Sequence, residues 1–132
     1  MYIDVSFAAD ALNPSSAYGK LAVVIDVFRA TTTIVTALAR GAERIVPVSA
    51  EKEICRACKN YPDALLAGEC MGEKIKGFHF GNSPFEFTHD AVAGRTIIMR
   101  TTNGTKAVHK ASAAKAVYLG AYVNATADAK II

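Results

Sequence analysis

The chain has 132 residues, of which 52% are apolar and 20% are charged. This composition is typical of one globular domain and excludes disordered and fibrous proteins. The formal net charge is +3, and the basic residues are scattered singly along the chain, which argues against a nucleic-acid partner. The longest apolar run has five residues, far fewer than the roughly 20 of a membrane helix. Because no signal-peptide pattern is visible either, we expect a cytoplasmic protein with no membrane partner.

Short apolar segments predict the strands. In residues 2–7, apolar and polar side chains alternate, which predicts a half-exposed strand. Residues 21–25 form a continuous apolar run, the pattern of a parallel strand covered on both faces. Residues 44–48 contain Pro47, which cannot donate to a strand ladder, so we expect an edge strand or a bulge there. Further continuous apolar runs, which predict central strands, are residues 64–67, 96–99 and 116–119.

Segments of helical period lie between these strands. Residues 31–40 place apolar side chains on one side and end before Gly41, which can take the left-handed conformation of a helix cap. Ser49 can cap a helix that runs to about residue 59, and Asn103 with Gly104 can open another. Strands that alternate with helices predict a single α/β domain over residues 1–132, with a mostly parallel open sheet.

The end of the chain has an unusual pattern. A helix capped by Asn124 would have eight residues and would finish on Ile131 and Ile132, with no polar turn after them. We therefore expect either further chain beyond this point or a homo-oligomer contact to cover these two side chains.

Polar side chains follow the apolar run at residues 21–25. Asp26 comes first, and Arg29, Thr31 and Thr32 stand at the start of a predicted helix. In open α/β sheets, ligands bind beyond the carboxyl ends of the strands, where helix N-termini point their amides. A carboxylate can hold a divalent cation, and a guanidinium can bind phosphate oxygens in pairs. This segment therefore predicts an anion cradle.

A second cradle is expected after residues 96–99. Hydroxyl and amide side chains and a glycine meet the start of a helix there: Thr101, Thr102, Asn103, Gly104 and Thr105. The glycine allows close backbone approach to an anion. Helix capping explains each segment alone equally well, but two such segments at one sheet edge favour binding.

The segment between Gly68 and Gly94 has 25 residues without a clear pattern. Unstructured connections of this length are uncommon in compact domains and tend to be lids or binding loops. Glu69, Glu73 and His79 are its candidate ligands or acid–base groups. We expect a lid; the alternative is an irregular excursion with a short helix near residues 85–89.

Other familiar motifs are missing or weak. Cys55 and Cys58 form a C-x-x-C pair inside a predicted helix, without the further ligands of a zinc site, so we interpret them as part of a helix face. Neither the P-loop pattern nor the dinucleotide-binding glycine pattern occurs.

Five segments, taken in order, carry a family resemblance. They are VVIDVFRATTTIVTAL (23–38), LLAGE (65–69), KIKGFHFGNSPFEF (74–87), TTNGTKA (101–107) and LGAYVNATA (119–127). Over nearly its whole length the chain resembles the 2-phosphosulfolactate phosphatase family. The resemblance implies a three-layer α/β/α sandwich and a Mg²⁺-dependent hydrolase that removes phosphate from 2-phosphosulfolactate, a small anionic substrate, on a route toward coenzyme M. It also implies that family members continue past residue 132.

The resemblance carries the family's motif positions onto this chain. We expect Asp26, Arg29 and Glu69 to be catalytic, with Asp26 and Glu69 as the ligands of Mg²⁺; a role for Asp26 as a covalent nucleophile is the alternative. The motif positions expected to bind substrate are Thr31, Thr32, Asn82, Ser83, Thr101, Thr102, Asn103, Gly104 and Thr105. Two positions depart from the family pattern: Cys70 stands where Arg is usual, and His79 where Asp is common.

Two hypotheses of function follow. The first is a Mg²⁺-dependent phosphatase that acts on 2-phosphosulfolactate or a similar small phosphorylated acid. The second is a non-catalytic anion-binding or assembly domain of the same fold, which would bind phosphate without turning over a phosphate ester.

Overall fold

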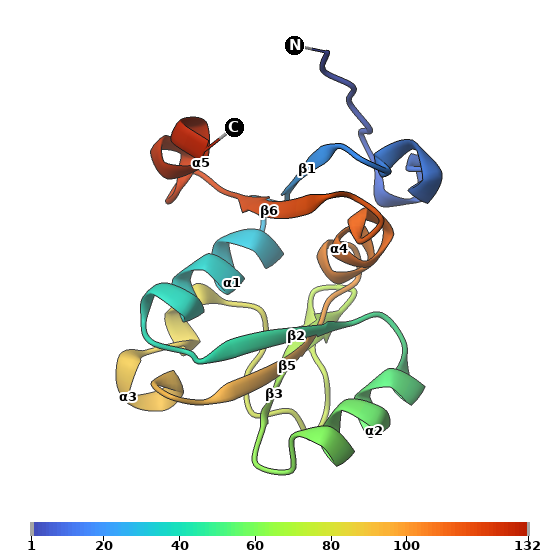
Figure 1. Cartoon of the computed structure of the whole chain (residues 1–132). Helices are drawn as coiled ribbons and strands as arrows, with labels where there is room; N and C mark the ends of the chain where they lie inside the picture. The colour runs from blue at the N-terminus through green and yellow to red at the C-terminus, as the bar shows by residue number, and fades with distance from the viewer. Residues whose placement is uncertain (1, 132) are drawn as a thin grey trace.

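The computed structural model describes residues 2–131, and Figure 1 shows the chain. The strands are β1 (Leu21–Ile25), β2 (Arg44–Val48), β3 (Leu65–Cys70), β4 (Glu73–Lys74), β5 (Thr96–Arg100) and β6 (Ala116–Gly120). The α-helices are α1 (Ala30–Ala39), α2 (Glu51–Asn60), α3 (His89–Val92), α4 (Gly104–Ala111) and α5 (Ala125–Ile131). Short 3-10 helices are η1 (Ala9–Ala11), η2 (Pro14–Ala17) and η3 (Pro84–Glu86).

The strands form two sheets rather than the one open sheet that the sequence predicts. The larger sheet has the order β2-β5-β3-β4, in which β2, β5 and β3 are parallel and β4 is antiparallel to β3. The smaller sheet is the parallel pair β1-β6. The α/β class and the mostly parallel pairing are confirmed. Strand β2 lies at an edge, as Pro47 predicts.

The two sheets lie on opposite sides of one helical layer. Helices α1 and α4 lie between the small sheet and the larger one (Figure 1), and both helices contact β2, while α4 also contacts β1 and α1 contacts β6. Helix α2 packs on the far face of the larger sheet against β2 and β5. The α1–α4 layer, the larger sheet and α2 are therefore the three layers of an α/β/α sandwich.

Strand β5 explains why the larger sheet needs helices on both faces. Its residues Ile97, Ile98 and Met99 have no exposed surface. Because side chains alternate along a strand, Ile97 and Met99 pack into one core cluster with α1, while Ile98 belongs to the cluster under α2 with Ala57. A continuous apolar run predicts such a strand correctly here.

The N-terminal prediction is wrong. Residues 2–7 form no strand, and their apolar side chains are exposed, from 65% at Val5 to 99% at Phe7. An alternating pattern makes a strand only where a neighbouring edge accepts its hydrogen bonds, and within the described residues none pairs with this segment. The prediction that both faces of residues 21–25 are covered is also wrong, because Leu21, Val23 and Ile25 are partly exposed.

The end of α1 and the start of α2 lie close to the predicted positions, but the residue that caps α2 differs from the prediction. Helix α1 ends before Gly41, whose φ of +93° is the left-handed conformation expected there. Helix α2 begins after Ala50, not Ser49. The reason is that the Glu53 carboxylate accepts hydrogen bonds from the Ser49 and Ala50 amides, at 2.6 and 3.1 Å, and from the Ser49 hydroxyl, so the cap comes from Glu53.

The long connection expected to be a lid is folded back onto the larger sheet. It holds β4, η3 and α3, and Phe87 and Val92 within it are fully buried in the core. The His79 and Phe80 amides donate to the Leu66 carbonyl of β3. The short helix expected near residues 85–89 appears as η3, followed by α3. This segment is therefore a packed part of the domain and not a lid.

No helix among residues 2–131 is long and apolar enough to cross a membrane. At the C-terminus, α5 extends to Ile131, whose side chain is 57% exposed, whereas Ile132 lies outside the described residues.

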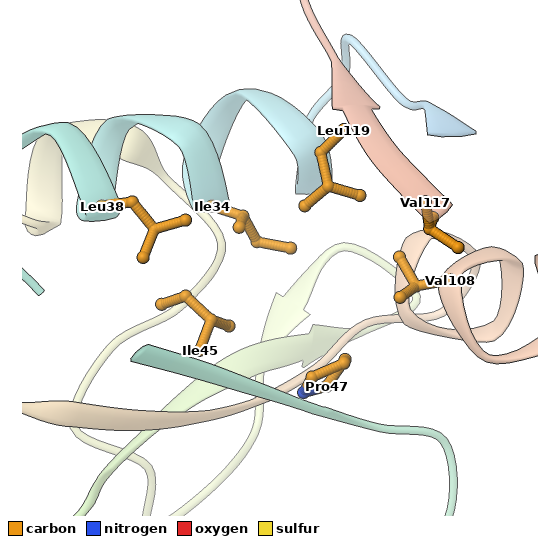
Figure 2. Close-up of a pocket in the computed structure, with 7 residues that line it drawn as sticks. All are labelled: Ile34, Leu38, Ile45, Pro47, Val108, Val117 and Leu119. Carbon is orange, nitrogen blue, oxygen red and sulfur yellow. The ribbon is translucent and has the colours of Figure 1, made fainter. Parts of the chain in front are cut away.

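An apolar cavity of about 210 Å³ lies between α1, α4, β2 and β6. Figure 2 shows the side chains that line it, which are all apolar: Ile34, Leu38, Ile45, Pro47, Val108, Val117 and Leu119. Such a lining offers no polar group to orient an anion, so this cavity is a packing gap between the layers and not a site for a phosphorylated acid.

Gly68 in β3 is a position where only glycine fits. Its φ is +142°, and a Cβ there would overlap the carbonyl group of Arg100 on β5. We expect Gly68→Ala to lower the free energy of unfolding by about 2–4 kcal/mol, from backbone strain and from separation of β3 and β5. Denaturant unfolding followed by circular dichroism measures this loss.

Gly72→Ala is the matched control. Gly72 also has a positive φ, of +87°, but no atom lies within 4 Å of its missing Cβ. The control is expected to cost about 1 kcal/mol from strain alone. Equal losses in the two variants would show that contact with β5 is unimportant.

Candidate functional site

The candidate site lies where β1, β3 and β5 end and α1 and α4 begin. The three chain segments that carry the predicted residues meet at this edge of the helical layer. The contacts that join them are between Asp26 and α4, between Glu69 and the loop after β5, and between α1 and the segment that follows Phe80.

Asp26 follows β1 and points at the start of α4. A Cβ added to Gly104 would lie 3.0 Å from Asp26 Oδ2 and would overlap the side chain of Ala30. Glycine at this position therefore lets the first turn of α4 approach both the Asp26 carboxylate and the first turn of α1. The sequence correctly predicts close backbone approach at Gly104.

Glu69, near the end of β3, joins two loops through its carboxylate. Its Oε1 accepts a hydrogen bond of 2.6 Å from the Thr102 amide, and its Oε2 accepts 2.8 Å bonds from the Thr102 hydroxyl and the Gly72 amide. The Thr102 hydroxyl in turn accepts a 3.0 Å bond from the Met71 amide. Glu69 is 8% exposed. These bonds hold the β3–β4 turn against the loop between β5 and α4.

The two carboxylates have opposite pKa shifts. Burial raises the pKa of Asp26, the Ala30 amide lowers it in part, and the negative charge of Glu69 raises it further. Burial also raises the pKa of Glu69, but the amides of Thr102 and Gly72, the Thr102 hydroxyl and the positive charge of Arg29 outweigh it, so this pKa lies below its usual value. Asp26 is thus the carboxylate whose charge is poorly compensated, and Glu69 the one whose charge is stabilised.

Arg29 supplies positive charge to this site. It is the residue that precedes α1, is half-buried, and stabilises the charge of Glu69. The site therefore combines two carboxylates with one guanidinium, at the end of the sheet where the sequence predicts an anion cradle.

The threonines at the start of α1 have their hydroxyls engaged by backbone. Thr31 is fully buried; its hydroxyl accepts from the Asp26 amide and lies within 2.8 Å of the carbonyls of Asp26 and Gly120. The Thr32 hydroxyl donates to the Val27 carbonyl at 2.9 Å. Both residues fix the β1–α1 turn, and their role in substrate binding stays a prediction.

The second cradle divides into a buried and an exposed part. Thr101 and Thr105 are buried and bond to each other: the hydroxyl of each accepts from the other's amide, at 3.0 and 3.1 Å. Thr102 and Asn103 are exposed. The buried pair caps α4, as the capping interpretation requires. In the exposed pair the Thr102 hydroxyl is engaged by Glu69 and Met71, so Asn103 is the residue that presents its side chain to an incoming ligand.

Asn82 and Ser83 come from the connection after β4. The Asn82 carbonyl accepts a 3.0 Å bond from Thr33 on α1, which attaches this segment to the same helical turn as Arg29. The Asn82 side chain is 7% exposed, and its Oδ1 has no hydrogen-bond partner among the described residues. Ser83 is half-buried, and its amide lies 3.4 Å from the Glu86 carboxylate.

Two residues outside the predicted set of site residues help to build this site. Thr33 is fully buried and makes the bond to Asn82, and Gly68 permits the contact of β3 with β5. The signal for Gly68 is a glycine inside an apolar strand, directly before an acidic residue. Thr33 gives no such signal, because its partner lies 49 positions away in the sequence.

A sequence model of the 2-phosphosulpholactate phosphatase family matches residues 7–132. The chain belongs to this family. It is 45% identical to a probable 2-phosphosulfolactate phosphatase of Clostridium acetobutylicum, over all of this chain and 57% of that protein. Relatives with the same description from Carboxydothermus hydrogenoformans and Symbiobacterium thermophilum are 50% and 49% identical, over 98% and 83% of this chain and 52% and 48% of their own lengths. The chain thus spans about half the length of these relatives.

The two positions that depart from the phosphatase family pattern differ in their contacts: one is exposed and the other is hydrogen-bonded to β3. Cys70 is exposed at the end of β3. His79 is tied to the same strand, because its Nδ1 accepts a 2.9 Å bond from the Leu66 amide while its own amide donates to the Leu66 carbonyl. His79 therefore anchors the connecting segment to β3.

The donor chemistry of the family's site fits Mg²⁺ through two carboxylates. Among residues 2–131 no cluster of three or more His, Cys, Asp or Glu side chains could hold a metal ion. Mg²⁺ is commonly held by one or two carboxylates with water and substrate oxygens completing the shell. The charge of Glu69 adds to burial in raising the pKa of Asp26, and a bound cation would offset that charge.

The lowered pKa of Glu69 makes stability depend on pH. The carboxylate stabilises the folded chain at pH values above its unfolded pKa, and this contribution is lost as the pH falls through the lower pKa of the folded state. At pH 7 we expect Glu69→Gln to lower the free energy of unfolding by about 1–3 kcal/mol, and the difference from wild type to shrink toward pH 3. Urea unfolding between pH 3 and pH 7 measures it.

Glu73→Gln is the control for this experiment. Glu73 lies on β4, next to the same turn, but is exposed. Its variant should follow the wild-type pH profile. A Glu69→Gln variant that did the same would show that the carboxylate does not hold the two loops together.

Proposed function

We propose that this chain carries the reaction centre of a Mg²⁺-dependent phosphatase that hydrolyses the phosphate ester of 2-phosphosulfolactate, a reaction of the type used in coenzyme M biosynthesis. Membership of the family supports the class of reaction. The observation that carries the proposal is that Asp26, Glu69 and Arg29 meet at one edge of the helical layer, beside the exposed Thr102 and Asn103.

The substrate is a small acid with negative charge at both ends, and Arg29 is the residue suited to bind it. A guanidinium donates paired hydrogen bonds to phosphate or sulfonate oxygens. Its position before α1 places this charge next to the helix N-terminus, which also favours anions. The Thr102 amide and hydroxyl are already donated to Glu69, so the exposed Asn103 is the neighbour whose side-chain amide would donate where charge develops as the phosphate ester breaks.

Asp26 and Glu69 are the residues that would hold Mg²⁺. When bound there, Mg²⁺ neutralises phosphate charge and lowers the pKa of a coordinated water. Glu69 contributes a carboxylate already oriented by three hydrogen bonds, so little is lost in ordering it. Asp26 contributes a carboxylate whose pKa is raised by burial and further by the charge of Glu69, so a cation at this point would stabilise its ionised form.

The direct test is release of inorganic phosphate from 2-phosphosulfolactate. We expect turnover with Mg²⁺ and none after removal of divalent ions by chelation, with recovery when Mg²⁺ is restored. The chain and a full-length relative, such as the one from Clostridium acetobutylicum, are assayed side by side. Mg²⁺-independent turnover by both proteins would contradict the metal assignment.

Asp26→Asn separates catalysis from stability. The substitution removes the charge but keeps an oxygen acceptor for the Ala30 amide, so we expect turnover to fall by about 100-fold or more. Because the folded chain raises the pKa of Asp26, the ionised side chain disfavours folding at pH 7, and the variant should be at least as stable as wild type. Phosphate release and denaturant unfolding measure the two effects.

Asp63→Asn is the matched control. Asp63 is exposed and lies in the turn before β3, at the opposite end of that strand from Glu69. It should leave turnover unchanged. Normal turnover in Asp26→Asn would remove Asp26 from the mechanism.

The second candidate function is non-catalytic anion binding by the same fold, which the positive charge of Arg29 at the start of α1 would support. Phosphate binding measured by calorimetry, without ester hydrolysis in either this chain or the full-length relative, would select this candidate over the phosphatase.

A further inference from the structure

One face of the small sheet is apolar and uncovered. Along β1, Ala22 and Val24 face the helical layer, and Val24 is 8% exposed. The alternate residues Leu21, Val23 and Ile25 point away from that layer and are 48%, 37% and 68% exposed. We call this side, together with the neighbouring surface of β6, the outer face.

Strand β6 completes the outer face. Tyr118 is paired with Val23, and Gly120 with Ile25. A Cβ at Gly120 would lie 3.1 Å from the side chains of both Val23 and Ile25, so glycine keeps this part of the face flat. Val117 and Leu119 point the other way, into the cavity beside α1 (Figure 2).

The edge of β1 is open as well. Its five residues pair with β6 on one side, and within residues 2–131 no strand pairs with the other side. A groove of about 550 Å³ runs along this edge, between β1, residues 4–9 and α4. Exposed strand edges present unpaired amides and carbonyls that accept a further strand.

An uncovered apolar sheet face and an open strand edge are both unusual in a globular domain. Parallel sheets are almost always covered on both faces, and burial of a Val, Leu or Ile side chain contributes about 1.5–3 kcal/mol. Further exposed apolar residues lie in the N-terminal segment (Ile3, Val5, Phe7) and in the chain after β6 (Tyr122, Val123). An exposed apolar sheet face marks an interface.

The lengths of the relatives indicate what covers it. The three relatives are each about twice as long as the region that matches within residues 1–132, so each carries a comparable length of polypeptide outside the matched region. We propose that the outer face and open edge of β1 are the surface on which this remaining part of the family's polypeptide packs, extending the small sheet and covering it. This inference does not depend on the proposed catalytic activity.

The test compares accessibility at one position in two intact proteins. Val23→Cys is made in this chain, and the aligned position is changed to Cys in the full-length Clostridium acetobutylicum relative. The rate of maleimide labelling at each position is followed by peptide mass spectrometry, which separates it from labelling of native cysteines. We expect rapid labelling in this chain and labelling about 100-fold slower in the relative, because reaction there requires local opening.

Phe85 is the matched control position. Its side chain is 84% exposed on η3, away from the small sheet. Phe85→Cys and the aligned substitution in the relative should label rapidly in both proteins. If the position of Val23 in the relative labels as fast as the control, the outer face is not covered and the proposal is wrong.

Photo-crosslinking identifies the occupant. A benzophenone maleimide attached at the Val23 position of the relative is irradiated in a mixture of isotopically light and heavy chains. The proposal requires links within one chain to peptides that have no counterpart in this chain. Links between light and heavy chains at the shared region would show that a second copy covers the face, and so would slow labelling of Val23→Cys in this chain combined with a dimer by light scattering. Either result overturns the proposal.

Discussion

The hydrogen bonds accepted by the Glu69 carboxylate are the constraint on which the candidate site depends. Strands β3 and β5 are neighbours in the sheet, but pairing alone does not fix the loops that follow them. The bonds from Thr102 and Gly72 do so, at 2.6–2.8 Å, and they require Glu69 to be ionised. The loop that they hold leads directly into α4, whose first residue, Gly104, approaches Asp26. The position of one carboxylate thus depends on the charge of the other.

This arrangement also explains why the two carboxylates differ. Glu69 has amide and hydroxyl donors and the charge of Arg29, and its pKa falls. Asp26 is half-buried near that negative charge with one compensating amide, and its pKa rises. The ionised form of such an acid disfavours folding at pH 7. Perturbed acids near a basic residue, beyond the carboxyl ends of parallel strands, are characteristic of functional sites, and the apolar cavity between the layers has no such groups.

The sequence predicts those parts of the fold whose causes are local. Residues 96–99 are apolar without interruption and become the strand buried on both faces, and Gly41 ends α1 because its backbone adopts a positive φ. Residues 2–7 have an equally regular pattern but no partner edge, and partner edges are not visible in a local pattern. The threonines also show what a local sequence pattern cannot predict. The pattern places Thr101 and Thr105 at the site, but a hydroxyl that caps a helix and one that binds phosphate have the same chemistry. Only the contacts distinguish them.

The small sheet contributes both to the candidate site and to the uncovered outer face. Its strands supply Asp26 at the end of β1 and Gly120 at the end of β6, and the Thr31 hydroxyl bridges the two strand ends. The same two strands have the open edge and the uncovered outer face. The side of the small sheet that faces α1 and α4 therefore supports the site, while the opposite side has no packing partner within residues 2–131. Any polypeptide that packs on the outer face stabilises β1, and with it the position of Asp26, so assembly on that face and the geometry of the site are linked through one strand.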